Sequence, residues 1–416
     1  MATDIIHGSH LGALYVSEES AFGTTGTERR VFPVADSPEV TLDQAELERP
    51  QLHVNPWDYQ NPVFGLKSSS GKFSHYLQPP ATFNNTGATP DTDAAAPLRL
   101  LLRCALGGES IAAGSDVDGA GVSATAFSVT ATQGARMPDG QLIAVADATD
   151  GFQACAVRTR STDALTVWPA LTGTPAGGED IANAMTFYPS VTNTRSVSLG
   201  LATAQNSARQ WRVNGACIRG VTFKVARGEL LAADFEFMGA TWTGPSDLSL
   251  SVAQASDPMY APLSTRGMLC YLQASATTTR TNLVIDSAEV KINTGLSLVE
   301  SLTGGIEGKR AVMRTDGLNE AFCEVTLTAP LDTNFESWWQ ARTALSLMLV
   351  VPFDAGAAER RFVIFHVGSC VIVGKPKSAK GAANLDKVTF TVRSKRNATT
   401  TATTELAKAP FTIGLI

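Results

Sequence analysis

The sequence predicts a mainly β fold: two tandem β-sandwiches, each with one flanking helix, and a small β-barrel inserted into the first sandwich. Three observations lead to this fold class. Most segments alternate apolar and polar residues with a period of two, as strands do. Short patterns recur in the same order in two halves of the chain. The first half also carries a stretch of short strands that the second half lacks.

The composition of the chain limits its class and its partners. Its 416 residues are 44% hydrophobic and 17% charged, which indicates a folded chain of two or three domains. The formal net charge of −6 argues against general nucleic-acid binding, which needs a basic surface. No apolar run approaches the roughly 18–20 residues that span a bilayer. We therefore expect a soluble protein with no membrane partner and no signal peptide.

The predicted strands are rich in Val, Phe and Thr and are separated by turns with Gly, Asp or Asn. The alternation is clear in the hairpin 217–239, whose second strand places Asp234 and Glu236 on its polar side. Other strands are predicted in 195–204, 322–329, 361–374 and 385–394.

Two segments are predicted to be helical. Residues 96–108 have Pro97 in the first turn and two glycines after the last apolar residue. Residues 333–344 begin with threonine and have glutamate three residues later, which is the capping-box pattern. We expect at least one of Trp338 and Trp339 to pack on the sheet rather than to form a sugar-binding platform.

The internal repeat has three collinear parts. VADSPEV at 34–40 recurs as VIDSAEV at 284–290, an offset of 250. The helix starts, Asp93 and Asp332, are 239 residues apart. The hairpin segment 215–228 matches 368–381 at an offset of 153. That match pairs Cys217 with Cys370, Gly228 with Gly381 and, further along, Phe237 with Phe390. Together the three matches indicate a duplication.

The fall in offset from 239 to 153 locates an insertion after the first helix. Residues 109–183 have short strands separated by frequent turns, which is typical of a small barrel. The expected domains are therefore the first sandwich in 1–108 and 184–260, the inserted barrel in 109–183, and the second sandwich with a C-terminal tail in 261–416.

The sequence offers no recognisable catalytic or cofactor motif. It has no phosphate loop, dinucleotide-binding glycine motif or zinc-protease motif. His7 and His10 have a possible metal-ligand spacing but no partner cluster, and His366 alternates within a strand as a structural residue does. The six cysteines are spread singly, so we expect buried, reduced thiols. We expect no enzyme, no cofactor and no metal.

Two segments carry a resemblance to a known family. GSHLGALYVSEESAFGTTG (8–26) and VTLDQAELERPQLHVNPWDYQNPVFGLKSSSGKFSHYL (40–77), together with the strand–helix–strand order of both halves, resemble the tail tube proteins of long-tailed, siphovirus-like bacteriophages. The part most like the family is ELERPQL, which leads through a loop into GLKSSSGKFSHYL. The resemblance covers both halves and excludes the insertion.

Members of this family have a β-sandwich with one flanking helix, and most carry one sandwich per chain and form six-membered rings. Duplicated members close a pseudo-sixfold ring from three chains. The resemblance therefore implies a virion structural protein whose homotrimeric rings stack head to tail into the tail tube, the conduit for DNA ejection. The implied partners are further copies, a tape measure protein, and tail terminator or tail-tip proteins. Viral DNA would cross the lumen without sequence-specific binding. The implied location is the virion tail, assembled in the host cytoplasm, with the inserted barrel as an outer decoration.

Some surfaces can be assigned within this expectation. Asp234 and Glu236 are candidate lumen-facing residues, although their polar side fits an outer surface equally well. An acidic lumen would keep DNA from sticking to the wall. The polar loop 41–65, with Trp57 and Tyr59, is expected to carry contacts between rings.

Other functions remain open at this point. A β-sandwich binding module, such as an adhesin or a carbohydrate-binding decoration, shares the architecture, as does another head–tail or baseplate component. The repeat favours the ring, because duplicated halves suit pseudosymmetric assembly. The Thr-rich segment 397–416 fits either an arm that docks on a neighbour or a disordered tail.

Overall fold

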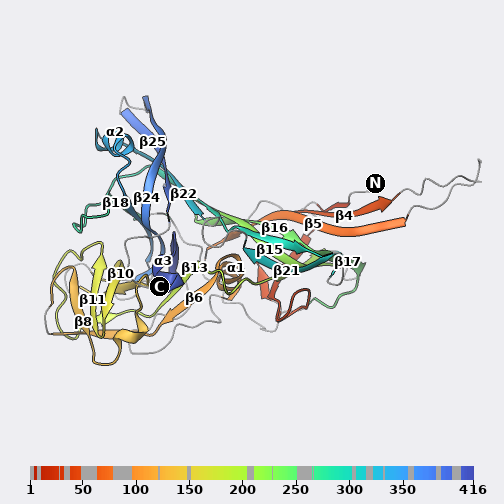
Figure 1. Cartoon of the computed structure of the whole chain (residues 1–416), viewed down its shortest axis with the longest axis horizontal. Helices are drawn as coiled ribbons and strands as arrows, with labels where there is room; N and C mark the ends of the chain where they lie inside the picture. Colours follow the sequence, from red (N-terminus) through yellow and green to blue (C-terminus); the bar gives the residue numbers. More distant parts are fainter. Residues whose placement is uncertain are drawn as a thin grey trace, which may run out of the picture.

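A computed structural model gives the fold of the chain (Figure 1). The structure describes residues 4–6, 11–27, 29–31, 38–47, 63–77, 96–119, 122–147, 151–203, 210–226, 228–250, 265, 267–301, 306–314, 322–330, 333–354, 360–380, 386–395 and 404–416. Antiparallel strands dominate these residues, so the predicted mainly β class is confirmed.

The first half of the chain begins with strands β1 (Asp4–Ile6), β2 (Leu11–Glu18), β3 (Arg29–Val31), β4 (Glu39–Leu47) and β5 (Val63–Tyr76), and then helix α1 (Ala96–Leu106). It continues with β6 (Gly107–Ala112), β7 (Ser115–Asp118), β8 (Ala126–Val129), the 3-10 helix η2 (Gly134–Arg136), β9 (Leu142–Val145), β10 (Gln153–Ser161), β11 (Ala164–Trp168), β12 (Asp180–Ile181) and β13 (Ala184–Pro189). It ends with β14 (Val197–Thr203), β15 (Gln210–Ala226), β16 (Ala232–Gly239) and β17 (Thr241–Ser246).

The second half contains β18 (Leu269–Ala274), β19 (Ser287–Asn293), β20 (Leu296–Glu300), β21 (Lys309–Arg314), β22 (Phe322–Pro330), helix α2 (Thr333–Gln340), β23 (Leu345–Asp354), β24 (Arg360–Lys380), β25 (Asp386–Ser394), helix α3 (Glu405–Lys408) and β26 (Thr412–Leu415).

Eight strands form a continuous antiparallel array through the middle of the molecule. Their order is β4-β5-β16-β15-β19-β22-β25-β24, with four strands from each half of the chain. The halves meet where β15 pairs with β19, from Gly220 opposite Asn293 to Ala226 opposite Ser287. The β4–β5 hairpin and the β24–β25 hairpin extend at two different ends of the molecule (Figure 1).

The two long strands, β15 and β24, each take part in two sets of pairings. The N-terminal part of β15 lies between β14 and β17, and β14 also pairs with β2. The N-terminal part of β24 lies between β23 and β26, and β23 also pairs with β18. The strand order of one half therefore recurs in the other.

A β-bulge sets the residue correspondence between the halves. Val197 and Leu199 of β14 are two residues apart, but their partners in β15, Ala216 and Val213, are three residues apart, so β15 contains one extra residue there. The same bulge occurs in the second half, where Leu345 and Leu347 of β23 lie opposite Cys370 and Val367 of β24. The bulges place Ala216 and Cys370 at corresponding positions, an offset of 154 rather than 153.

The predicted equivalence of Cys217 and Cys370 is therefore wrong by one residue. Cys370 lies in the main core, as Ala216 does, whereas Cys217 packs with Leu296 and Val312 under the β20–β21 hairpin. A slip of one residue turns a side chain to the opposite face of a strand. The predicted equivalence of Phe237 and Phe390 is also wrong. By the pairing of β16 with β5 and of β25 with β22, the residue that corresponds to Phe390 is Phe235.

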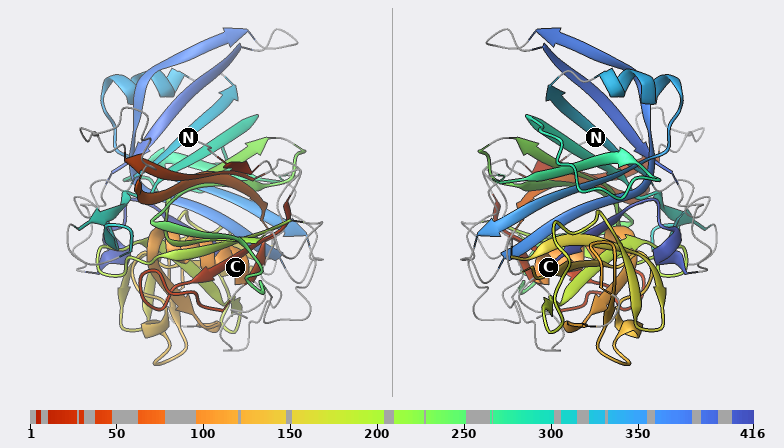
Figure 2. Two further views of the ribbon diagram at one scale, coloured as in Figure 1. Left: turned by 90° about the vertical axis from the view of Figure 1, so that its right-hand side faces the viewer. Right: turned by 90° about the vertical axis from the view of Figure 1, so that its left-hand side faces the viewer.

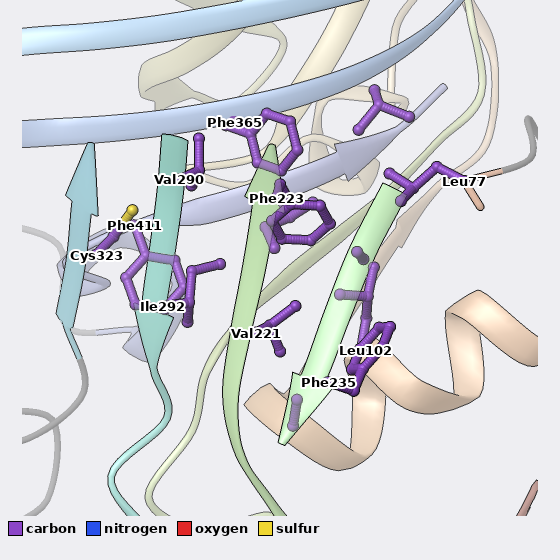
Figure 3. Packing of buried hydrophobic residues seen from close by; sticks show 14 of the residues in the cluster. Leu77, Leu102, Val221, Phe223, Phe235, Val290, Ile292, Cys323, Phe365 and Phe411 are labelled. Carbon is purple, nitrogen blue, oxygen red and sulfur yellow. The ribbon is translucent and has the colours of Figure 1, made fainter. Parts of the chain in front are cut away.

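The main core lies on the apolar face of the eight-stranded array (Figure 3). The expected alternation is confirmed: Val221, Phe223 and Phe235 are almost fully buried. The ring of Phe223 contacts that of Phe365, with centroids 4.6 Å apart. Such an aromatic pair stabilises the fold by about 0.5–1.5 kcal/mol beyond the contribution of the buried apolar area. This core joins residues from both halves of the chain.

Strands β7 to β12 close into a barrel. Strands β6 and β13 lead into and out of it as an antiparallel pair, and β26 pairs with the other edge of β13. The barrel core also contains side chains of the second half: Tyr271, Met348, Val350, Phe362, Ile364 and Ile416. In both views of Figure 2 the barrel lies on one side of the central strands, opposite α2 and the β24–β25 hairpin.

Both predicted helices are present and are shorter than expected. Helix α1 ends at Leu106, where β6 begins, and α2 ends at Gln340. Phe335 of α2 is almost fully buried and stacks on Phe390, with ring centroids 4.4 Å apart. Trp338 and Trp339 are partly buried and pack against the core, as expected.

The end of the chain is ordered and docks on its own fold. Residues 404–416 form α3 and then β26, which lies between β13 and β24 of the same chain. Neither alternative for the tail, an arm on a neighbour or a disordered segment, holds for these residues. Residues 397–403 and most of the predicted loop 41–65, including Trp57 and Tyr59, lie outside the described residues.

Candidate assembly interface

The eight-stranded array has a polar face opposite the core. Alternation along each strand puts every second residue on this face, and the pairing registers align these residues across the strands. The charged members are Glu39 and Asp43 of β4, Lys72 of β5, Asp234 and Glu236 of β16, Lys224 of β15, Glu289 and Lys291 of β19, Glu324 of β22, Lys387 and Arg393 of β25 and Lys377 of β24.

The charges on this polar face alternate in sign. Lys72 lies 3.1 Å from Glu39, and Lys224 lies 3.3 Å from Asp234. Arg393 donates a hydrogen bond from Nε to the carboxylate of Glu324 at 2.6 Å. Exposed pairs of this kind each contribute about 0–1 kcal/mol. The face is therefore mixed in charge, which differs from the acidic surface that we expected of a lumen.

Asp234 and Glu236 come together on this face, two residues apart on β16. Asp234 accepts a hydrogen bond from the Ser74 hydroxyl at 2.5 Å and pairs with Lys224. Glu236 is exposed and lies opposite Lys72 in the β5–β16 register. Both residues thus belong to the polar surface of the continuous sheet rather than to the core.

A groove of about 660 Å³ crosses this face at the junction of the halves. Its charged lining residues are Glu39, Lys72, Arg219, Glu236, Lys291 and Glu324. Acids and bases are interleaved along it, so it has no concentration of one sign that would capture a phosphate or a cation.

Both ends of the eight-stranded array are edges. Residues 371–373 and 377–380 of β24 pair with β25 on one side, and no strand among the described residues pairs with them on the other. The outer side of β4 pairs only with the three-residue strand β1 in the described part of the chain. Alternation alone does not distinguish an edge strand from a central one, so the sequence did not predict that these strands lie at edges. The segment Lys375-Pro376-Lys377 is the signal that could have marked one, because lysine and proline are typical of edges.

A cavity of about 620 Å³ lies between the barrel and the second half. His366 lines it, with Nδ1 3.3 Å from the Thr412 hydroxyl and its ring 5.8 Å from that of Trp168. Burial, and secondarily the nearby Arg158 guanidinium, lowers the pKa of His366 to about 3. A neutral imidazole fixed by neighbours fits the expected structural role.

The six cysteines are buried and unpaired, as predicted. Burial raises the pKa of Cys155 and Cys370 to about 12, so both thiols stay protonated and unreactive at neutral pH.

Other kinds of site can be examined only in part. Within the described residues, no three His, Cys, Asp or Glu side chains are grouped as metal ligands would be. His7 and His10, the residues with metal-like spacing, lie outside that part of the chain. A search of the described residues for a helix long and apolar enough to cross a membrane finds none.

The chain was also compared with known proteins. No family model matches it, and no curated protein matches it in sequence.

Proposed function

We propose that this protein is a virion structural protein that assembles as homotrimeric rings, which stack into a phage tail tube. The observation that carries the proposal is the β15–β19 junction. There, two halves with the same strand order join edge to edge and make one continuous sheet. The proposed architecture is two tandem tail-tube-like sandwiches with an inserted barrel. The same edge-to-edge pairing that joins the two halves within one chain would also join neighbouring chains in the ring.

The dimensions of such a ring suit a conduit. Eight strands per chain give twenty-four strands for three chains. At about 4.8 Å between neighbouring strands, a closed ring of this size is about 37 Å across before strand tilt widens it. Side chains on the polar face would leave a lumen wide enough for duplex DNA.

The polar face supports the role of a passive wall. Its acids and bases neutralise one another across strands, so a lumen lined by it would offer phosphates no continuous basic track. DNA would then pass without sequence-specific contacts. Asp234 and Glu236 would line this lumen.

Closure of the ring also removes both exposed edges. An open sheet edge invites uncontrolled pairing, and barrels remove it by closing. Contacts between rings are heterologous and do not close, so stacking would propagate into a tube.

Negative-stain electron microscopy of the purified protein tests the proposal. We expect rings with a central hole, or tubes built from them. A dispersed monomer at high concentration that binds glycans would instead identify the alternative, a β-sandwich binding module. An assembly at a tail end, without tube formation, would identify another head–tail or baseplate component.

A further inference from the structure

The two ends of the eight-stranded array are complementary, and the internal junction gives the register in which they fit. In that junction, the C-terminal part of β15 lies between β16 and β19. Strand β24 corresponds to β15 and β25 to β16, by the shared strand order and the shared bulge. On β15, the side opposite β16 is covered by β19. The corresponding side of β24, opposite β25, has no partner strand among the described residues.

Strand β4 is the counterpart of β19. The repeated motif ends within both strands, at Glu39-Val40 and Glu289-Val290, and each strand pairs with the next strand of its own half, β5 or β22. Val40 corresponds to Val290 at the offset of 250. On its other side β19 pairs with β15, whereas β4 has no long strand there among the described residues.

We propose that β4 of one chain pairs with the open edge of β24 of a second copy, and that β1 covers the β4 edge until that copy displaces it. This inference rests on the proposed function, since it names the contact that would close the ring. Past a second, wider bulge in β24 between Val373 and Lys377, the offset between β15 and β24 rises from 154 to 155, so Lys377 corresponds to Thr222. Transferring the pair Thr222 and Lys291 from the internal junction then places Lys377 of one copy opposite Thr41 of the next.

Charge complementarity favours a second copy as the occupant of each edge. Lys375 and Lys377 are exposed on β24, and Glu39 and Asp43 are exposed on β4. In the proposed register Lys377 lies opposite Thr41, between Glu39 and Asp43, and Lys375 lies in the adjacent bulge of β24, so the charges of the two edges are complementary. Lysines and proline on the β24 edge also discourage pairing with strands of other sequence.

Strand β1 occupies the same edge of β4. Residues Asp4–Ile6 pair with Leu42, Thr41 and Val40, which are the positions that the second copy would use. Only three residues pair in this way, whereas the internal junction between the halves pairs seven. A longer strand arriving from a second copy would therefore replace β1 with a net gain in backbone hydrogen bonds. The N-terminal strand acts as a removable cover that delays self-association.

Disulfide cross-linking tests the proposed register. The full chain with Thr41→Cys and Lys377→Cys should form intermolecular disulfides under mild oxidation, because directly opposite residues have the Cα separation that a disulfide requires. The native cysteines are buried, which keeps the background low. The positive control is Thr222→Cys with Lys291→Cys, the corresponding pair inside one chain, which should form an intramolecular disulfide.

Glu39→Cys with Lys377→Cys is the matched off-register control. Diagonal neighbours in a sheet are about 7–8 Å apart, so we expect at least tenfold less cross-linking. If this pair links as well as Thr41 with Lys377, the register is wrong. Removing residues 1–8 from the Thr41→Cys, Lys377→Cys chain should accelerate cross-linking at least tenfold, and an unchanged or slower rate contradicts the cover role of β1.

The outcomes separate this inference from the proposed function. If electron microscopy shows rings and the internal control pair cross-links, but Thr41→Cys and Lys377→Cys do not, the proposed β4–β24 interface is wrong and the proposed tube function is unaffected. In-register cross-linking into small oligomers that never form rings or tubes would support the interface and count against the tube.

Discussion

Glu19 connects three backbone segments through one buried carboxylate. Its Oε1 accepts hydrogen bonds from the Gly215 amide at 2.8 Å and the Ser198 hydroxyl at 2.6 Å. Its Oε2 accepts from the Gly23 amide at 2.7 Å. The side chain is 7% exposed, and water cannot readily replace it. Glu19 therefore ties the turn after β2 to β14 and to the centre of β15.

Replacing Glu19 by alanine should lower the free energy of unfolding by about 3 kcal/mol, because buried donors would lose their acceptor. Glu39→Ala is the matched control: this carboxylate is exposed and has one surface ion pair, so we expect a change of about 0–1 kcal/mol. Urea unfolding followed by circular dichroism measures both values. Equal effects would mean that the Glu19 network contributes little.

His366 gives the fold a defined pH dependence. Its pKa is about 3 in the folded chain, below its value near 6.5 when unfolded, so the unfolded chain binds the proton between these values. Its contribution to stability is complete above about pH 6.5 and is lost as the pH falls towards 3. The loss has a limiting slope of about 1.4 kcal/mol per pH unit. His366→Gln should flatten the curve of unfolding free energy between pH 6 and 4, and an unchanged curve would contradict this assignment.

At the scale of elements, the sequence predicted what local patterns determine. Period-two alternation identified the hairpin 217–239 and its buried side, and the capping and glycine signals found both helices. It could not give the register between the halves. The identity at offset 153 was placed one residue out, because a β-bulge depends on the pairing of two strands and leaves no local mark.

The same limit applies to the edges and to the end of the chain. Whether a strand lies at an edge depends on which distant strands pair with it, as β24 and β4 illustrate. Residues 412–415 pair with β13 and β24, which are far away in sequence, and a Thr-rich tract gives no sign of that pairing.

Helix α2 offers a test of how it is anchored. Phe335 is 1% exposed and stacks on Phe390, so Phe335→Ala should cost about 3–5 kcal/mol of unfolding free energy. Trp339 is only partly buried, so Trp339→Ala should cost less than half as much. Thermal and urea unfolding of the two variants decide the order. A larger loss of unfolding free energy for Trp339→Ala than for Phe335→Ala would mean that Trp339, rather than Phe335, anchors the helix.

At the scale of the whole molecule, the barrel and the second half share a core. Tyr271, Met348 and Ile364 pack into the barrel cluster, and Trp168 of β11 donates a hydrogen bond to the Thr277 carbonyl at 3.2 Å. The barrel is thus bound to the fold by apolar contacts as well as by its two connecting strands.

Replacing residues 115–181 by a short linker should therefore expose apolar side chains of β23 and β24 and reduce solubility. We expect aggregation, or at least a several-fold lower yield of folded protein. Changing Met348 and Ile364 to polar residues in the shortened chain should restore solubility, since the exposed surface is then polar. Gel filtration measures this outcome, and a fully soluble shortened chain without those changes would mean that the barrel is independent decoration.

The central claim is that two corresponding halves let three chains close a ring. Rotational analysis of end-on particles by electron cryomicroscopy tests it most directly. We predict rings of three chains whose density is threefold symmetric and nearly sixfold, with the polar face of the eight-stranded array lining the hole. Rings of six complete chains, or particles without a closed sheet around the centre, would contradict it.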